Sequence, residues 1–168
     1  MWDFTCPVCK SDDCVLPVGP KNSSILIVGD HPGDEEIKEG KCFVGPTGGV
    51  LRAELAKVGI DMRAIRITNL WLHAPNKNAA CLEYGMKKAL EESIGKKIIL
   101  LIGSEPVKQF CGISVEEWNG LEVTSEFLPN ARVMASVQPA TVFHGGLGEF
   151  RFAMQSFSDL LKEIQHAR

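Results

Sequence analysis

The sequence predicts a three-layer α/β/α domain built around a central, mainly parallel sheet of four strands. Short apolar segments at 25–28, 64–68, 97–102 and 132–136 alternate with segments whose apolar residues recur at helical spacing. Strands that alternate with helices along the chain are typical of a parallel sheet covered by helices on both faces. The length of 168 residues suits one domain. We therefore expect residues 1–168 to form a single domain.

The first three elements follow from apolar runs and the glycines that end them. Residues 25–28 read ILIV and lie between a polar segment and Gly29, as expected of a buried strand. A helix is predicted over 49–58, because its apolar residues share one face and Gly59 stands where a left-handed residue ends a helix. The next strand, 64–68, closes at Asn69, and a loop follows to residue 80.

The second half of the chain continues the same alternation. A helix is predicted from Cys81 to residue 93, and the nearly all-apolar strand 97–102 is expected at the centre of the sheet. Ser104 is a candidate N-cap for a short helix that runs to residue 111. Residues 118–128 are expected to form a hairpin or an edge strand. The last core strand is 132–136, and a long helix over 147–165 packs its apolar stripe on the core.

A ligand pocket is expected where the loops leave the strands. Three such loops carry polar or conformationally special residues: 29–45, 69–76 and 137–145. The carboxyl ends of parallel strands lie at one edge of the sheet, and ligands of open α/β sheets bind there. The first loop combines glycines and an aromatic residue with four acidic residues within six positions, Asp34, Glu35, Glu36 and Glu39.

Composition excludes few functions. The chain is 45% apolar and 23% charged, and its apolar runs are too short to cross a membrane. The amino-terminal segment has neither a basic region nor an apolar core, so we expect no signal peptide and a cytoplasmic location. We also expect a monomer. A net charge of −3 neither supports nor excludes a nucleic-acid partner.

The cysteines indicate a metal site rather than disulfides. Cys6 and Cys9 are separated by two residues, a spacing that lets both thiolates face one metal across a tight turn. No βα unit surrounds the pair, which disfavours a thioredoxin-like redox role. We therefore expect residues 1–24 to form a metal-binding knuckle and a loop packed on the domain.

The motifs, in this order, resemble those of the uracil-DNA glycosylase superfamily, in particular its family 4 with an iron–sulfur cluster. After Cys6-x-x-Cys9 come the segments GDHPG at 29–33 and GKCFVG at 40–45, then ITN at 67–69, a cysteine before a helix, and LIG at 101–103. The resemblance covers most of the chain. It implies a DNA-repair glycosylase that flips uracil, or a related base, out of DNA and removes it by hydrolysis.

The resemblance also implies roles for residues of the pocket. Phe43 would stack on the base and Asn69 would read its Watson–Crick edge, with His31 beside them as a further base-binding residue. Glu36 or Asp30 would position or activate the attacking water. The residues alone leave other readings open: Phe43 as a core side chain, Asn69 as a turn residue, and the acidic run as a solvated face.

The third motif departs from the family pattern. The stretch SVQPA at 136–140 places Gln138 where the family has a histidine that donates a hydrogen bond to the base. A glutamine amide still donates but does not titrate near neutral pH. Asp30 and His31 also alter the first motif. The resemblance therefore implies reduced or altered activity, or a catalytically weak DNA-binding accessory protein that acts with a polymerase or repair partner.

The metal ligands depart from the family pattern as well. Four cysteines hold the family's cluster, whereas here His73 takes the third position and Cys81 the fourth. The resemblance implies a [4Fe–4S] cluster on Cys6, Cys9, His73 and Cys81. Zinc is the rival metal, since a Cys3His set suits it equally well. Cys14 is the rival fourth ligand.

The expected partner is DNA, either single-stranded or a uracil-containing duplex. The loop after Gln138 would touch it, with Val142, Phe143 and His144 as contact residues. Val142 or Phe143 suits an apolar wedge in the base stack, although either is equally compatible with burial. A small zinc-bearing nucleotide-binding domain unrelated to repair is the third reading of the sequence.

Overall fold

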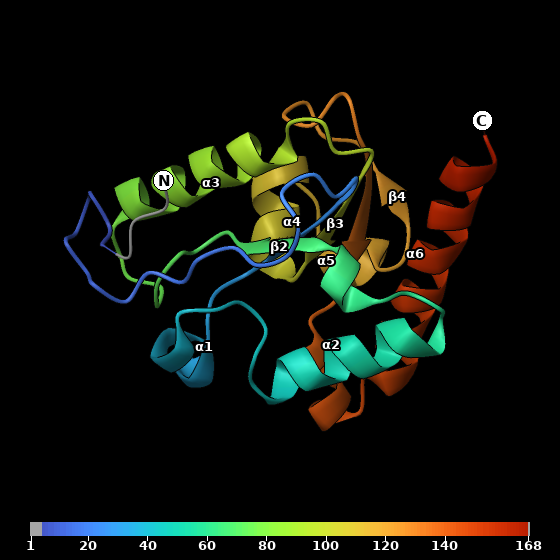
Figure 1. Ribbon diagram of the computed structural model, residues 1–168, viewed down its shortest axis with the longest axis horizontal. Helices are drawn as coiled ribbons and strands as arrows, with labels where there is room; N and C mark the ends of the chain where they lie inside the picture. Colours follow the sequence, from blue (N-terminus) through green and yellow to red (C-terminus); the bar gives the residue numbers. More distant parts are fainter. Residues whose placement is uncertain (1–4, 168) are drawn as a thin grey trace.

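A five-stranded sheet lies between two layers of helices in the computed structural model, which describes residues 5–167 (Figure 1). The strand order is β2-β1-β3-β5-β4. The strands are β1 (Ile25–Gly29), β2 (Arg66–Asn69), β3 (Ile98–Ile102), β4 (Glu122–Val123) and β5 (Arg132–Ser136). Four of them are parallel and β4 is antiparallel to β5. The predicted α/β/α fold is confirmed, with one edge strand more than the four expected.

The apolar strand β3 occupies the middle of the sheet, as its sequence predicts. All five of its residues are buried. Their side chains alternate between two apolar cores, one under α2 (Pro46–Lys57) and α6 (Leu147–His166), the other under α3 (Ala79–Ser93) and α4 (Ser104–Cys111) (Figure 1). A strand covered on both faces has no reason to alternate apolar with polar residues. Within residues 5–167, none of the helices combines the length and apolarity that crossing a bilayer needs.

Several short elements were not predicted. Residues 29–45, expected as one loop, contain the helix α1 (Asp34–Glu39), which ends at Gly40 in the left-handed conformation. Its first turn holds Asp34, Glu35 and Glu36, and carboxylates are favourable there because they face the positive end of the helix dipole. With six residues, α1 is too short to show a hydrophobic period.

Three further short elements separate the larger ones. The 3₁₀ helices η1 (Met62–Ala64) and η2 (Pro139–His144) follow α2 and β5, and the single-turn helix α5 (Val115–Trp118) precedes β4. The segment 118–128 therefore contributes an edge strand of only two residues.

A buried ion pair joins the edge strand β2 to α3. The Arg66 guanidinium donates to both carboxylate oxygens of Glu92 at 2.7 and 2.9 Å, and it also donates to the carbonyl of Gly19. The two side chains are only 6% and 12% exposed. In this environment the loss of one partner leaves an uncompensated buried charge. The free-energy cost of that charge exceeds the stabilisation that the intact pair provides.

Removing the charge of Glu92 should therefore destabilise the fold. We expect Glu92→Gln to lower the free energy of unfolding by about 3 kcal/mol, measured by urea denaturation. Glu91→Gln is the matched control, because Glu91 is its neighbour on α3 and pairs with Lys88 at the surface; a change below about 1 kcal/mol is expected there. Equal effects of the two substitutions would contradict this account.

Candidate functional site

The predicted pocket is present at the carboxyl edge of the sheet. It is a cavity of about 190 Å³ to which all three predicted loops contribute. Its walls come from the segment between β1 and the first turn of α2, from the ends of β2 and β3, and from the start of η2: Asp30, His31, Gly33, Glu36, Phe43, Thr47, Asn69, Ile102, Gln138, Pro139 and Ala140. All six catalytic and base-binding residues proposed from the sequence line this one cavity. Their roles remain predictions.

Both the backbone and the ring of Phe43 pack closely against glycines, one of them at the end of β1. Its φ of +54° lies in the left-handed region, which is uncommon for an aromatic residue. Two glycines make room for it. A Cβ at Gly48 would lie 1.8 Å from the Phe43 carbonyl oxygen, and one at Gly29 would lie 2.7 Å from the ring. The glycines of the GKCFVGPTGG segment and of β1 therefore place the aromatic ring in the pocket wall.

Glu36 closes the loop that contains it. One carboxylate oxygen accepts from the Gly33 backbone N–H at 3.3 Å and the other from the Gly45 N–H at 2.8 Å. The side chain is buried, so these bonds are made in a low-dielectric environment that strengthens them. Glu36 thus connects both ends of the segment 33–45, and both of its oxygens already have a donor.

Asp30 and Gln138 meet across the pocket. The Gln138 Nε2 donates to Asp30 Oδ2 at 3.0 Å, although the two residues are 108 positions apart. They approach each other over Gly103, where a Cβ would lie 2.9 Å from Gln138 Nε2 and 3.2 Å from Asp30 Cβ. Burial raises the pKa of the Asp30 carboxyl above its ordinary value. His31, a backbone hydrogen bond from Glu105 and the Gln138 amide act in the opposite direction.

Asn69 is buried beneath the pocket and has a partner there. The residue is 3% exposed, and its Nδ2 lies 3.8 Å from the Cys42 sulfur. Burial raises the pKa of the Cys42 thiol to about 12, and the thiol donates to the Leu16 carbonyl. Cys42 is therefore a neutral thiol that packs under Asn69 and is not a nucleophile.

The remaining pocket and loop residues divide by exposure. His31 is exposed, with Nδ1 within 3.1 Å of the Pro32 carbonyl, which leaves Nε2 directed away from its own backbone. On η2, Phe143 is 57% exposed whereas Val142 packs against the core under α2 and α6. His144 borders a neighbouring hollow of about 400 Å³ that shares Gln138 with the pocket. Of the two wedge candidates, only Phe143 has a free apolar face.

Sequence reasoning did not single out several pocket residues. Thr47 lines the cavity from the first turn of α2, Ile102 from the last position of β3, and Pro139 and Ala140 from the start of η2. Thr47 lies between the glycines of the GPTGG segment and Pro139 follows Gln138, so proximity to the motifs was the available signal. Ile102 gives no such signal, because it belongs to an apolar strand.

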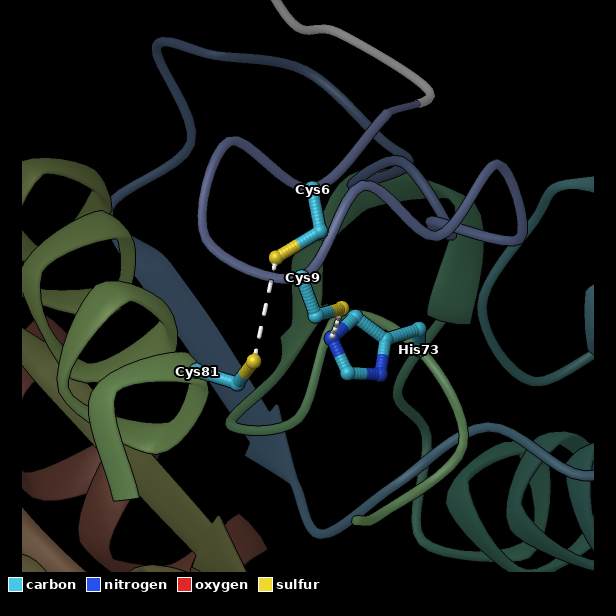
Figure 2. A group of neighbouring side chains, drawn as sticks. All are labelled: Cys6, Cys9, His73 and Cys81. Carbon is cyan, nitrogen blue, oxygen red and sulfur yellow. Dashed lines mark hydrogen bonds between the residues drawn. The ribbon is translucent and has the colours of Figure 1, made fainter. Parts of the chain in front are cut away.

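A second constellation brings the predicted metal ligands together. Figure 2 shows Cys6 and Cys9 of the amino-terminal turn facing His73 and Cys81. The four donor atoms all lie within 4.8 Å of one another. The Cys6 and Cys81 sulfurs are 4.0 Å apart, and Cys9 Sγ is 3.5 Å from His73 Nε2. The Cys3His group predicted from the sequence is thus assembled, and it is one that could hold a metal.

Hydrogen bonds around this group orient its ligands. His73 Nδ1 is 2.8 Å from the Ala74 carbonyl, so Nδ1 carries the proton and the Nε2 lone pair faces the thiols. Asn76 Oδ1 accepts from the Asn78 N–H, which directs its Nδ2 to Cys81 Sγ at 3.6 Å. Donors to thiolates and acceptors from imidazole N–H groups are the usual surroundings of metal ligands.

Cys14 is close to this group but does not belong to it. It is buried in the same small apolar cluster as Trp71 and Leu72, while the assembled donor set within residues 5–167 contains His73 instead. The backbone N–H of Val15 donates to the Leu72 carbonyl, which attaches the amino-terminal segment to the loop after β2. Among the described residues, the group that could hold a metal therefore contains His73 and not Cys14.

Comparison with known proteins gives a family match over most of the chain. The sequence profile described as the Uracil DNA glycosylase superfamily matches residues 16–162. A type-4 uracil-DNA glycosylase of Thermotoga maritima is 25% identical over 158 residues, which are 87% of this chain and 80% of the relative. A type-4 uracil-DNA glycosylase of Archaeoglobus fulgidus is 29% identical over 107 residues. This match covers 58% of the chain and about half, 53%, of the relative's length.

Among solved structures, a molybdopterin biosynthesis protein from Mycobacterium abscessus superimposes with a TM-score of 0.41 at 8% identity. The alignment covers 87% of this chain and 99% of that one. This similarity is too low to bear on fold or function.

The position of Phe43 can be tested with two adjacent glycines of α2. Gly48→Ala places a Cβ against the Phe43 carbonyl, whereas a Cβ at Gly49 meets nothing within 4 Å. We expect Gly48→Ala to displace Phe43 and lower the free energy of unfolding by about 2 kcal/mol or more. Gly49→Ala should be neutral or stabilising by up to about 1 kcal/mol. Chemical denaturation measures both, and equal stability of the two variants would show that Phe43 is not held by Gly48.

Proposed function

The chain belongs to the uracil DNA glycosylase superfamily, and from this premise we propose that it flips uracil, or a related base, out of DNA and hydrolyses the bond between base and sugar. The observation that carries the proposal is the single cavity in which Phe43, Asn69 and the Asp30–Gln138 pair converge from three strand ends. An aromatic face, an amide and a carboxylate are the groups that stack on a base, read its edge and act on the sugar.

Phe43 and Asn69 are the proposed base-binding residues. The Phe43 ring stacks on the flipped base, and its fixed backbone lowers the entropy lost on binding. The Asn69 amide reads the Watson–Crick edge. Because Asn69 Nδ2 also contacts the Cys42 sulfur, the orientation of the amide is set before the base arrives. His31 lines the same cavity and is the further proposed base-binding residue.

Asp30 is the proposed water-activating residue. A water molecule attacks C1′ of the sugar and gives its proton to the Asp30 carboxylate. The bond between C1′ and the base nitrogen breaks, and its electron pair leaves with the base. Glu36 is less suited to accept this proton, because both of its oxygens accept backbone N–H groups. Its negative charge instead stabilises the cationic sugar of the transition state.

Gln138 borders the leaving base. It stands where the family has a histidine, so the expected rate of base removal depends most on this residue. One hydrogen of its amide is committed to Asp30, and the other is proposed to donate to the base as negative charge develops there. Because the hydrogen bond to Asp30 occupies part of the Gln138 amide, it also supports a second candidate function. In that alternative, the chain binds DNA with little or no catalysis and serves a polymerase or a repair protein.

The proposed DNA contacts lie on η2. Phe143 is the proposed wedge that enters the base stack, because its ring is exposed beside the pocket. Val142 positions the turn from the core side, and His144 lies next to the neighbouring hollow, where it is available to a phosphate. The substrate is single-stranded DNA or a uracil-containing duplex.

We propose that the Cys3His group holds a [4Fe–4S] cluster. Three thiolates and an imidazole nitrogen with its lone pair directed inward are suitable donors, and the similarity to type-4 enzymes supports the cluster. One zinc ion is the competing candidate. Its bonds of about 2.3 Å would set thiolate sulfurs about 3.8 Å apart, close to the spacing of Cys6 and Cys81. The metal's part is structural: it fastens the amino-terminal turn to the segment 73–81.

Glycosylase activity is tested with uracil-containing single-stranded and duplex oligonucleotides, followed by alkaline cleavage of abasic sites. We expect the wild-type protein to generate abasic sites. Asp30→Asn should lower kcat by roughly a hundredfold or more, since a general base contributes at least that factor. Asp159→Asn is the control, because Asp159 also accepts from a glutamine amide but lies on the exposed face of α6.

Two outcomes separate the candidate functions. Cleavage by the wild type that Asp30→Asn reduces supports the glycosylase. No cleavage by the wild type, combined with cleavage by Gln138→His, would reject it and favour the DNA-binding role.

Metal content is measured on the purified protein. Brown protein with bound iron and sulfide supports the cluster, and colourless protein with stoichiometric zinc rejects it. His73→Ala should lower the bound metal severalfold because it removes a donor, whereas Cys14→Ala should leave the metal content unchanged. The reverse pattern would assign the fourth ligand to Cys14.

A further inference from the structure

We propose that Gln138 is a positioning residue, whose amide holds the Asp30 carboxylate ionised and in one orientation. The proposal rests on the proposed function only for its catalytic consequence. The interaction itself is a property of the free protein, so it can be tested without a substrate.

The contact is built into the ends of three strands. Asp30 follows β1, Gln138 follows β5, and Gly103 follows β3, which lies between those two strands in the sheet. The 3.0 Å bond from Gln138 Nε2 to Asp30 Oδ2 passes over Gly103, whose φ of +106° is accessible to glycine and not to residues with a side chain. The Gln138 main chain is also fixed, because its carbonyl accepts from the Thr141 N–H and hydroxyl. The glutamine therefore reaches Asp30 from a rigid turn.

The charges around Asp30 show why such a donor matters. Burial favours the neutral acid, and Glu105 on α4 and Glu36 on α1 are further carboxylates near the same cavity. His31 and the backbone hydrogen bond from Glu105 act in favour of the ionised form. Gln138 is the side-chain donor to this carboxylate among the described residues, and unlike a histidine its amide does not titrate. A hydrogen bond to the ionised form lowers a carboxyl pKa, so removing it raises the pKa.

This role gives the glutamine of the third motif a function that differs from that of a histidine. A histidine in place of Gln138 would carry a charge that varies with pH. The glutamine has two amide hydrogens and no titration, so one hydrogen serves Asp30 while the other remains available to the base. Gln138 therefore acts on the reaction through Asp30, the carboxylate that activates water. This effect is additional to its own contact with the leaving nucleobase.

The test is the titration of the Asp30 carboxyl carbon by NMR in the free protein, with the signal assigned by its absence in Asp30→Asn. We expect Gln138→Met, which keeps the length of the side chain and removes the donor, to raise the Asp30 midpoint by about one pH unit. Gln155→Met is the matched control. It removes a glutamine-to-aspartate hydrogen bond that is also 3.0 Å long, on the exposed face of α6, and it should leave Asp30 unchanged.

Gln138→Glu is the second variant, and it retains the shape of the side chain. It is used if Gln138→Met does not fold. It replaces the donor with a second carboxylate, so the upper of the two coupled midpoints should exceed the wild-type value. An Asp30 midpoint that is unchanged in either variant, or that shifts equally in Gln155→Met, would overturn the proposal. An inactive protein whose Asp30 midpoint shifts as expected would reject the glycosylase function and leave the positioning role intact.

Discussion

The pocket depends on a steric constraint at the carboxyl edge of the sheet. Gly29 ends β1 and Gly103 directly follows β3, and the missing side chains leave space that other residues fill. The Phe43 ring and the Asn69 amide occupy the space at Gly29, and the Asp30–Gln138 pair occupies the space at Gly103. Groups that are distant in sequence thereby approach within hydrogen-bonding distance, and the chemistry of the site follows from that approach.

The sequence was sufficient to predict the layers of the fold and the edge that carries the pocket. Apolar runs identify buried strands regardless of their partners, and the polar loops identify the ends of those strands. Whether the carboxylates of 34–39 face solvent or the protein was not predictable, because burial of Glu36 depends on the Gly33 and Gly45 N–H groups, one of them nine positions away. The same holds for the Asp30–Gln138 bond, which requires the order of β1, β3 and β5.

The metal group illustrates the reverse case. The spacing of Cys6 and Cys9 reveals that two thiols share a turn, and the resemblance to family 4 supplied His73 and Cys81. Spacing alone did not distinguish His73 from Cys14. In the structure His73 stands in the Cys3His group, where the Ala74 carbonyl fixes one imidazole nitrogen and leaves the other facing the thiols. A ligand's accessory hydrogen bonds are invisible in sequence unless the loop conformation is known.

The separation of the metal ligands along the chain has a consequence for the order of assembly. Cys6 and Cys81 are 75 positions apart, and β1, α2 and β2 lie between them. During synthesis the amino-terminal pair emerges first and must wait for the last donor until α3 has begun to form. Closing a loop of this length costs a few kcal/mol of chain entropy, which folding of the intervening strands removes in advance. A metal held by this group would therefore be incorporated at a late stage of folding, when the first half of the sheet already exists.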